Sequence, residues 1–262
     1  MKTSNVWIIA AGAAASMMLG ANTAKAEDGE WEFSVAPFYL WAKGIEGNSS
    51  AGGRELPLAL DFKDDILENL DAAFAIHFEA RKDRLTLFAE YNYAKLDPGS
   101  TATAGPVTLK ADVEFKDIMA EAGLTWAVAE SATLRWEILG GLRYYKQDLD
   151  IKLKSDREGG QLLPESASVG DRWLHPFAGG RVIADLGERW TFRARADYGY
   201  EGSDNTALQG IATLDYRFSD WGSAFFGYRY YEMDFDNGAS RRDQYGFDGN
   251  QQGPLLGVNL YF

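Results

Sequence analysis

The sequence predicts an all-β fold, a transmembrane antiparallel β-barrel of about ten strands, and its pattern is compatible with eight to twelve. Three observations predict this fold. Segments of about ten residues alternate between apolar and mixed side chains, which is the period of a strand. The connectors between these segments are alternately short and long, as in membrane barrels. Beyond the N-terminus, no stretch reaches the roughly 18 consecutive apolar residues of a spanning helix.

The first 26 residues are typical of a cleaved secretory signal peptide, and residues 27–262 then form the barrel. Lys2 supplies the charged start, residues 6–19 the short apolar core, and an Ala-x-Ala motif ending at Ala26 the cleavage site. The alternative is a membrane anchor. Because the apolar run is shorter than the roughly 20 residues of a spanning helix, we favour cleavage after Ala26.

Composition excludes several classes of function. The formal net charge of −13 argues against a nucleic-acid partner, since binding phosphates needs clustered Lys and Arg. The chain has no cysteine, which excludes disulfides, thiolate zinc sites and a cysteine nucleophile. With 2 histidines, a His-rich metal site is not expected either. We therefore expect no cofactor and no bound metal.

Alternation is clearest in three of the predicted strands. The first has an apolar and aromatic face from Trp31 to Trp41, which includes Tyr39. The segments that begin at Arg84 and Thr191 alternate in the same way. In chain order, the ten predicted strands are 31–42, 72–82, 84–97, 113–129, 132–149, 171–186, 189–201, 206–219, 222–235 and 252–262.

The connectors predict which end of the barrel faces which compartment. Long loops are expected at 43–71, 98–112, 150–170 and 236–251, and tight turns at most of the other connections. In barrels of this kind the turns are periplasmic and the loops extracellular, so an even strand number puts both termini in the periplasm. Residues 56–62 could form an eleventh strand, but the same parity keeps them in the first loop. Residues 64–70 could form a short helix there, either folded inward or capping the outside.

Aromatic spacing gives an independent test of the membrane barrel. Trp31 and Trp41 are ten residues apart, as are Trp190 and Tyr200. Ten tilted strand residues rise roughly 25 Å, the height of the apolar band of a membrane barrel with aromatics at its two edges. A soluble β-sandwich also alternates, but it would bury its apolar face.

Two parts of the chain resemble known proteins. The run from Leu256 to Phe262 resembles the C-terminal assembly signal of small Gram-negative outer-membrane β-barrels, in which alternating apolar residues lead to a terminal Phe. Segments 31–41, 61–71 and 77–81 resemble a largely uncharacterised porin-like family. The resemblance implies an outer-membrane location, contact with outer-membrane lipid and lipopolysaccharide, and assembly by periplasmic chaperones and the barrel assembly machinery. It implies no substrate, because this fold serves many functions.

Charged residues dominate the face expected to line the lumen. The inward set is Glu79, Glu90, Glu121, Arg135, Glu137, Arg143, Arg181, Arg193, Arg195, Asp197, Asp215, Arg217 and Arg229. In a ten-strand ring, acids on the early strands would face arginines on the later ones. The charges then form either a salt-bridged plug or a polarised constriction that orients a passing solute. We favour the plug, because a barrel of this size is close to the eight-strand kind that side chains fill.

Neither histidine has a nucleophile placed beside it by spacing. His77 and His175 both have lumenal parity, and either could serve as a general base only if a partner came from elsewhere in the fold. Asp234-x-Asp236-Asn237-Gly238 suggests a calcium loop, but its glycine is at the fifth position and not at the sixth, so we interpret it as an acidic turn. No catalytic residue is assigned.

The leading functional hypothesis is therefore a non-catalytic barrel, either a narrow porin-like channel or a structural barrel with a charged lumen. The second is an outer-leaflet hydrolase, a lipid hydrolase or a protease, that uses His77 or His175. The third is a binding or adhesion barrel that acts through its long loops.

Overall fold

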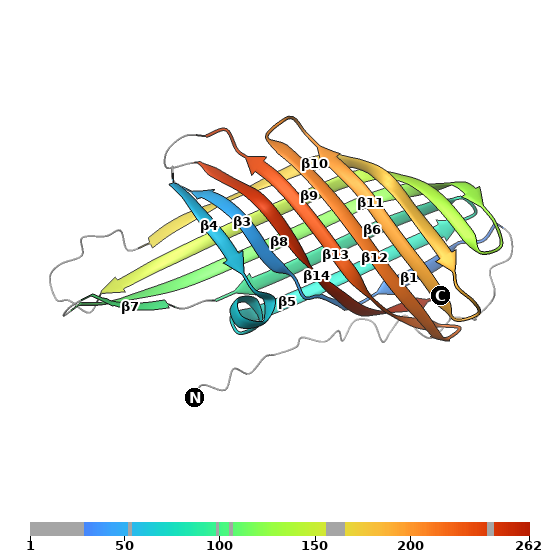
Figure 1. Cartoon of the computed structure of the whole chain (residues 1–262), viewed down its shortest axis with the longest axis horizontal. Helices are drawn as coiled ribbons and strands as arrows, with labels where there is room; N and C mark the ends of the chain where they lie inside the picture. Colours follow the sequence, from blue (N-terminus) through green and yellow to red (C-terminus); the bar gives the residue numbers. More distant parts are fainter. Residues whose placement is uncertain (1–28, 52–53, 98–99, 105–106, 156–165, 240–243) are drawn as a thin grey trace.

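A computed structural model describes residues 29–51, 54–97, 100–104, 107–155, 166–239 and 244–262 (Figure 1). The predicted signal peptide and its cleavage site at Ala26 lie outside the described residues. Within the described ranges, no helix has both the length and the apolarity needed to cross a membrane.

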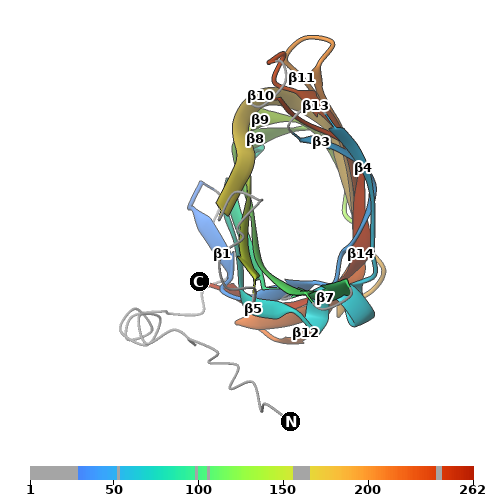
Figure 2. The same cartoon turned by 90° about the vertical axis from the view of Figure 1, so that its left-hand side faces the viewer.

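Ten antiparallel strands close into a ring, as predicted (Figures 1 and 2). The first is interrupted and consists of β1 (Glu32–Ala36), β2 (Tyr39–Trp41) and β3 (Gly44–Ala51). β1 pairs with both the second and the last strand of the ring, and this pairing closes it. The other nine are β5 (Leu70–Lys82), β6 (Leu85–Leu96), β8 (Val107–Glu130), β9 (Leu134–Ser155), β10 (Ser166–Asp185), β11 (Trp190–Tyr200), β12 (Asn205–Ser219), β13 (Gly222–Asp236) and β14 (Tyr245–Tyr261).

Several strands run well past their predicted ends, so parts of the predicted long loops are wrong. β8, β9 and β10 have 24, 22 and 20 residues, about twice what a membrane crossing needs. Beyond the apolar band the backbone pairing of β8 and β9 continues through segments in which charged residues alternate with apolar ones, such as Lys110 opposite Lys154 and Asp112 opposite Lys152. β7 (Ser100–Ala104) pairs with β8 in the same region.

The segment suspected of being an eleventh strand is a strand outside the ring. β4 (Arg54–Leu60) pairs with β3 as a hairpin, so the ring keeps ten members. A short helical turn, η2 (Phe62–Leu67), follows it and is capped by the Asp61 side chain, which accepts from two backbone amides. Ile66 is buried against the barrel wall, and the turn lies beside the ring of strands and not across its opening (Figure 2).

An apolar band with aromatic edges surrounds the barrel, as predicted. Exposed tryptophans mark the end with the tight turns, namely Trp31, Trp126, Trp136, Trp190 and Trp221. Exposed tyrosines lie toward the other end, namely Tyr91, Tyr198, Tyr200 and Tyr228. Leucines such as Leu87 and Leu142, 42% and 52% exposed, lie between these edges. In water such a surface would be costly, whereas in hydrocarbon it is the stable arrangement.

The predicted face of the first strand is wrong at its outer end. Tyr39 and Trp41 point into the lumen and are 5% and 8% exposed, while Phe38 and Leu40 face outward. The strand breaks between β1 and β2, at Pro37 and Phe38, and this break exchanges the two faces. A one-residue change of register has this effect because successive side chains of a strand alternate. The pair Trp31 and Trp41 therefore does not span the band, although Trp190 and Tyr200 are both exposed at its edges.

Charged side chains gather on the outer surface of the barrel just beyond the apolar band. Lys95 contacts Asp71 at 2.9 Å and Glu114 at 3.0 Å, and Lys116 contacts Glu114 at 2.6 Å. Hydrogen bonds from Lys116 and Lys95 lower the pKa of Glu114 to about 2. This cluster lies at the edge of the exposed apolar band.

Candidate functional site

Stacked aromatic rings fill the lumen at the end with the extended strands. Trp173 stacks on Phe235 with ring centroids 4.0 Å apart, and on Tyr145 at 5.3 Å. Tyr145 stacks in turn on Tyr231 at 5.5 Å, and Tyr245 closes the group. None of these five rings is more than 8% exposed. The space inside the ribbon ring of Figure 2 is therefore filled by side chains at this level.

A buried ion pair that the sequence did not single out lies beside these rings. Lys43 donates to Asp117 and, at 2.7 Å, to Gln251, while Gln147 donates to Asp117 at 2.9 Å. Lys43 was missed because residues 43–71 were assigned to a loop. The inward parity of the fourth predicted strand could have identified Asp117.

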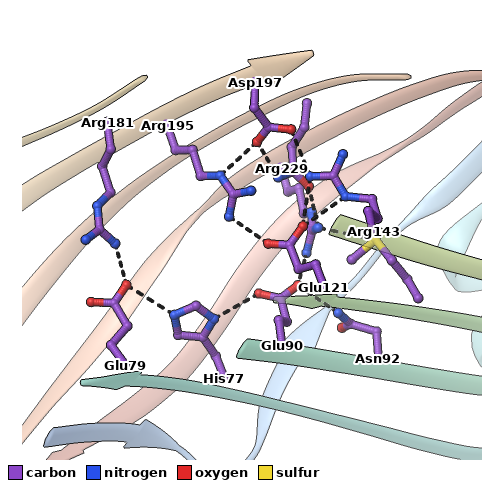
Figure 3. A network of polar contacts seen from close by, with 12 residues as sticks. His77, Glu79, Glu90, Asn92, Glu121, Arg143, Arg181, Arg195, Asp197 and Arg229 are labelled. Carbon is purple, nitrogen blue, oxygen red and sulfur yellow. Dashed lines mark hydrogen bonds and ion pairs between the residues drawn. The ribbon is translucent and has the colours of Figure 1, made fainter. Parts of the chain in front are cut away.

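Arg143 is the centre of the lumenal network (Figure 3). Its guanidinium donates to Glu121 at 2.9 Å and to Asp197 at 2.8 Å, and all three side chains are 0% exposed. The cation also lies over the rings of Phe177 and Tyr231, at 4.6 Å and 5.1 Å from their centroids. Charges removed from water need such partners, since leaving one unpaired is strongly destabilising.

Two further arginines connect strands that are not neighbours in the ring (Figure 3). Arg195 of β11 donates to Glu121 of β8 at 2.6 Å and to Asp197 of its own strand at 2.8 Å. Arg229 of β13 donates to Glu90 of β6 at 2.5 Å. Acids on early strands thus face arginines on later strands, although Glu90 pairs with Arg229 and not with the arginines of β11.

The half of the lumen nearer the tight turns holds a second group of charges. Arg181 donates to Glu79 across the lumen and to Glu137 on the adjacent strand at 2.6 Å, and Arg135 donates to Glu137 at 2.6 Å. His77 lies between two carboxylates, with Nδ1 3.2 Å from Glu90 and Nε2 3.3 Å from Glu79 (Figure 3). An imidazole protonated on both nitrogens satisfies both contacts, because each carboxylate can only accept.

Arg193 is held less tightly than the other arginines of the network. Its guanidinium is 3.6 Å from Asp215 and 3.9 Å from Glu79, and its side chain is 30% exposed. Asp215 already accepts from Asn259 at 3.0 Å and from Thr213 at 3.1 Å. Among the residues that the structure describes, Arg193 donates no hydrogen bond.

A cavity of about 130 Å³ lies beside Arg193, in the half of the lumen with the tight turns. Arginines line one side of it, and Ile211, Phe225 and Leu255 contribute apolar surface. A single water needs roughly 15 Å³ of such space, so the cavity has room for several waters or a small organic molecule.

One residue of the predicted lumenal set lies apart from the network. Arg217 is exposed at the rim with the tight turns, where it donates to the carbonyl of Asp220 at 2.6 Å and lies over the ring of Tyr261. It follows the inward parity of its strand, but it lies near the strand's end, where the guanidinium reaches water. The other twelve residues of the set each form at least one ion pair, in the contacts just described.

The acidic turn at 234–238 contains no apparent calcium site. The Gly238 amide donates to Asp236 at 2.7 Å, so this aspartate caps its own turn. Among the described residues, no group of three or more His, Asp or Glu side chains is arranged to hold a metal ion.

Comparisons with known proteins identify the fold only. No protein-family model and no curated protein matches the chain. The outer membrane protease OmpT from Escherichia coli gives a TM-score of 0.56 at 10% identity, covering 92% of this chain and 100% of that one. The chain has the fold of a small outer-membrane β-barrel. The translocator domain of the autotransporter NalP from Neisseria meningitidis gives 0.48 at 16% identity, covering 92% and 91%.

The barrel holds both of its histidines inside the lumen. His77 contacts two carboxylates, as described above. His175 is fully buried, and a Cβ at Gly199 would overlap its ring. Within the described part of the chain, no hydroxyl side chain hydrogen-bonds to either imidazole. The arrangement therefore lacks the nucleophile–base contact of a serine hydrolase.

Proposed function

We propose that the protein is a non-catalytic outer-membrane barrel whose lumen is closed to ions. One observation carries the proposal, namely a layer of side chains less than 2% exposed that crosses the lumen. This layer is made of Arg143, Arg229, Tyr145, Tyr231, Met119, His175, Gln147, Gln209 and Gln251. A conducting pore needs a continuous water path, and side chains that are this inaccessible to water support a lumen closed at their level. The leading hypothesis allows a narrow channel or a structural barrel. The packing of this layer favours the structural barrel.

The proposal includes the route by which the chain reaches its membrane. A signal peptide cleaved after Ala26 exports it, periplasmic chaperones carry it, and the barrel assembly machinery inserts it among lipid and lipopolysaccharide. Phe262 supports the role of the C-terminal run, because its backbone exchanges two 3.0 Å hydrogen bonds with Phe33 at the seam of the ring. The tight turns then face the periplasm and the extended strands face the outside.

Single-channel recording of the purified, refolded protein tests the closed lumen. We expect no steady conductance steps from protein that migrates as a folded barrel on an unheated detergent gel and shifts on boiling. Stable, uniform steps from such protein would overturn the proposal.

A charge-balanced variant tests the assigned plug. Replacing Arg143 and Glu121 together by Ser removes one charge of each sign and opens space at the centre of the layer. We expect this double variant to conduct. The matched control replaces Lys146 and Asp148, an ion pair on the outer face of β9, by Ser and should stay closed. If the lumenal pair also stays closed although it folds, the layer we assign is not what blocks the lumen.

A further inference from the structure

We propose that the cavity beside Arg193 binds a small organic monocarboxylate that enters from the periplasmic end. The inference goes beyond the closed barrel, since a ligand can occupy this half of the lumen while the layer above it stays sealed.

Arg193 has unused hydrogen-bonding capacity beside the cavity. A guanidinium carries five N–H donors, and those of Arg193 meet no acceptor among the described residues. Its nearest carboxylate oxygens are 3.6 Å and 3.9 Å away, compared with 2.5–2.9 Å for the pairs of Arg143, Arg195 and Arg229. A donor-rich cation beside a cavity is therefore available to an external acceptor.

The charges around the cavity are not all neutralised to the same extent. Four arginines line it, Arg181, Arg193, Arg195 and Arg229, together with three acids, Glu79, Glu90 and Asp215. His77, between two of those acids, is the remaining titratable side chain of the lining apart from tyrosines. Arg181 and Arg195 are also neutralised by acids just outside the lining, namely Glu137, Glu121 and Asp197. Arg193 is therefore the member whose charge is least neutralised. An anion fits this imbalance, whereas a cation would have to displace an existing pair.

The apolar part of the lining favours an organic carboxylate over an inorganic anion. Phe225, Leu255, Ile211 and Ala36 face the same space as the arginines. A carboxylate that bonds Arg193 in a bidentate fork could place an aliphatic or aromatic group against these side chains. Phosphate would gain nothing from them. The volume of about 130 Å³ limits such a ligand to a few carbon atoms or one ring.

The position of the lining residues indicates from which end of the barrel a ligand reaches the cavity. The lining includes Asn259 and Tyr261 near the end of β14 and Asp215 near the end of β12, close to the tight turns. The Arg193 side chain is 30% exposed, while the arginines deeper in the lumen, Arg143 and Arg229, are 0% and 1% exposed. A ligand therefore reaches Arg193 first from the turn end.

Fluorine NMR with 4-fluorobenzoate tests the proposal on the whole folded barrel in lipid nanodiscs, with empty discs subtracted. We expect saturable binding. Arg193→Gln should weaken it about tenfold or more, since it removes a charge-assisted bidentate contact. The matched control is Arg217→Gln, which removes a guanidinium at the same end of the barrel but outside the cavity, and it should leave binding unchanged. Equal weakening by both substitutions, or no saturable binding to the unmodified protein, would overturn the proposal.

Two competitors and one further variant identify what the cavity recognises. The neutral amide 4-fluorobenzamide and inorganic phosphate should each bind at least several-fold more weakly than the carboxylate. If the amide binds equally well, Arg193 is not the recognising group. If phosphate binds equally well, the site is a general anion site and the organic carboxylate is wrong. Ile211→Phe fills the cavity and keeps Arg193, so it should abolish binding in a barrel that still shows heat-modifiable migration. Binding that survives Ile211→Phe would place the ligand elsewhere.

Discussion

The guanidinium of Arg195 lies 2.6 Å from a carboxylate oxygen of Glu121, although their strands, β11 and β8, are separated in the ring by two others. The contact crosses part of the lumen and joins two stretches of wall that are not adjacent. Each partner also bonds a second charge, Asp197 for the arginine and Arg143 for the glutamate. Removing one member therefore leaves more than one charge without its partner.

Glu121→Ala should destabilise the barrel by about 3–5 kcal/mol, because it leaves Arg143 and Arg195 short of an acceptor in a buried site. The measurement is reversible unfolding by urea in lipid vesicles. Glu232→Ala, at an exposed position, is the control and should change the free energy of unfolding by less than about 0.5 kcal/mol. Similar values for the two substitutions would mean that the network contributes little to stability.

Arg195→Gln should cost clearly more stability than Arg193→Gln. Arg195 makes contacts of 2.6 Å and 2.8 Å, whereas those of Arg193 are longer than 3.5 Å and its side chain is partly hydrated. The same urea titration compares the two variants, which lie two residues apart on one strand. An equal loss would contradict the difference in packing.

Leu87→Arg should cost roughly 2–4 kcal/mol, because Leu87 faces the middle of the apolar band. Leu186→Arg, in the turn after β10, is the control and should cost at most about 1 kcal/mol near the interface. Unfolding in vesicles measures both. A smaller penalty at Leu87 than at Leu186 would show that the band is placed at the wrong height.

Brominated lipid acyl chains should quench Trp136 but not Trp41. Trp136 is 51% exposed on the outer surface, and Trp41 is 8% exposed and packs against Arg229 in the lumen. Trp136→Phe should therefore reduce the quenched part of the fluorescence, while Trp41→Phe should leave it unchanged. A reduction on removing Trp41 would restore the lipid-facing orientation that simple alternation predicts.

The outer-surface cluster around Glu114 should remain ionised down to about pH 3, since the pKa of this carboxyl is lowered to about 2. A lowered pKa contributes stability that is fully present above the carboxyl's ordinary pKa and is lost progressively as the pH falls from there through about 2. Carbon-13 NMR of the Glu114 side chain measures this titration. Lys116→Met removes the larger cause and should move the midpoint toward the ordinary value of about 4.3. A Glu114 midpoint near 4.3 in the unmodified protein would contradict the ion pairs.

The barrel, its ten ring strands and the inward parity of its charged residues could be predicted because a strand alternates with a fixed period. Glu79, Glu121 and Arg195 follow from that period alone. Tyr39 and Trp41 could not be placed, since the break at Pro37 shifts the register without leaving an unambiguous signal in the pattern. The sequence also could not predict which acid pairs with which arginine, because this depends on the tilt and stagger of the strands in the closed ring. Lys43 and β4 lie in a segment that was assigned to the first loop, because an even number of strands left no place in the ring for the short alternating run at residues 56–62.

Ion pairs between strands that are not neighbours constrain how the barrel can enter a bilayer. Glu79 pairs with β10, Glu90 with β13 and Glu121 with β11, so none of these contacts can form within a single growing hairpin. An open, partly inserted sheet would present bare guanidinium and carboxylate groups to hydrocarbon, where no counter-charge is available. Strand-by-strand insertion is thus disfavoured at every intermediate stage. The polypeptide must curl until its two seam strands meet before its inner surface loses contact with water, so the charged interior makes membrane insertion an all-or-none event.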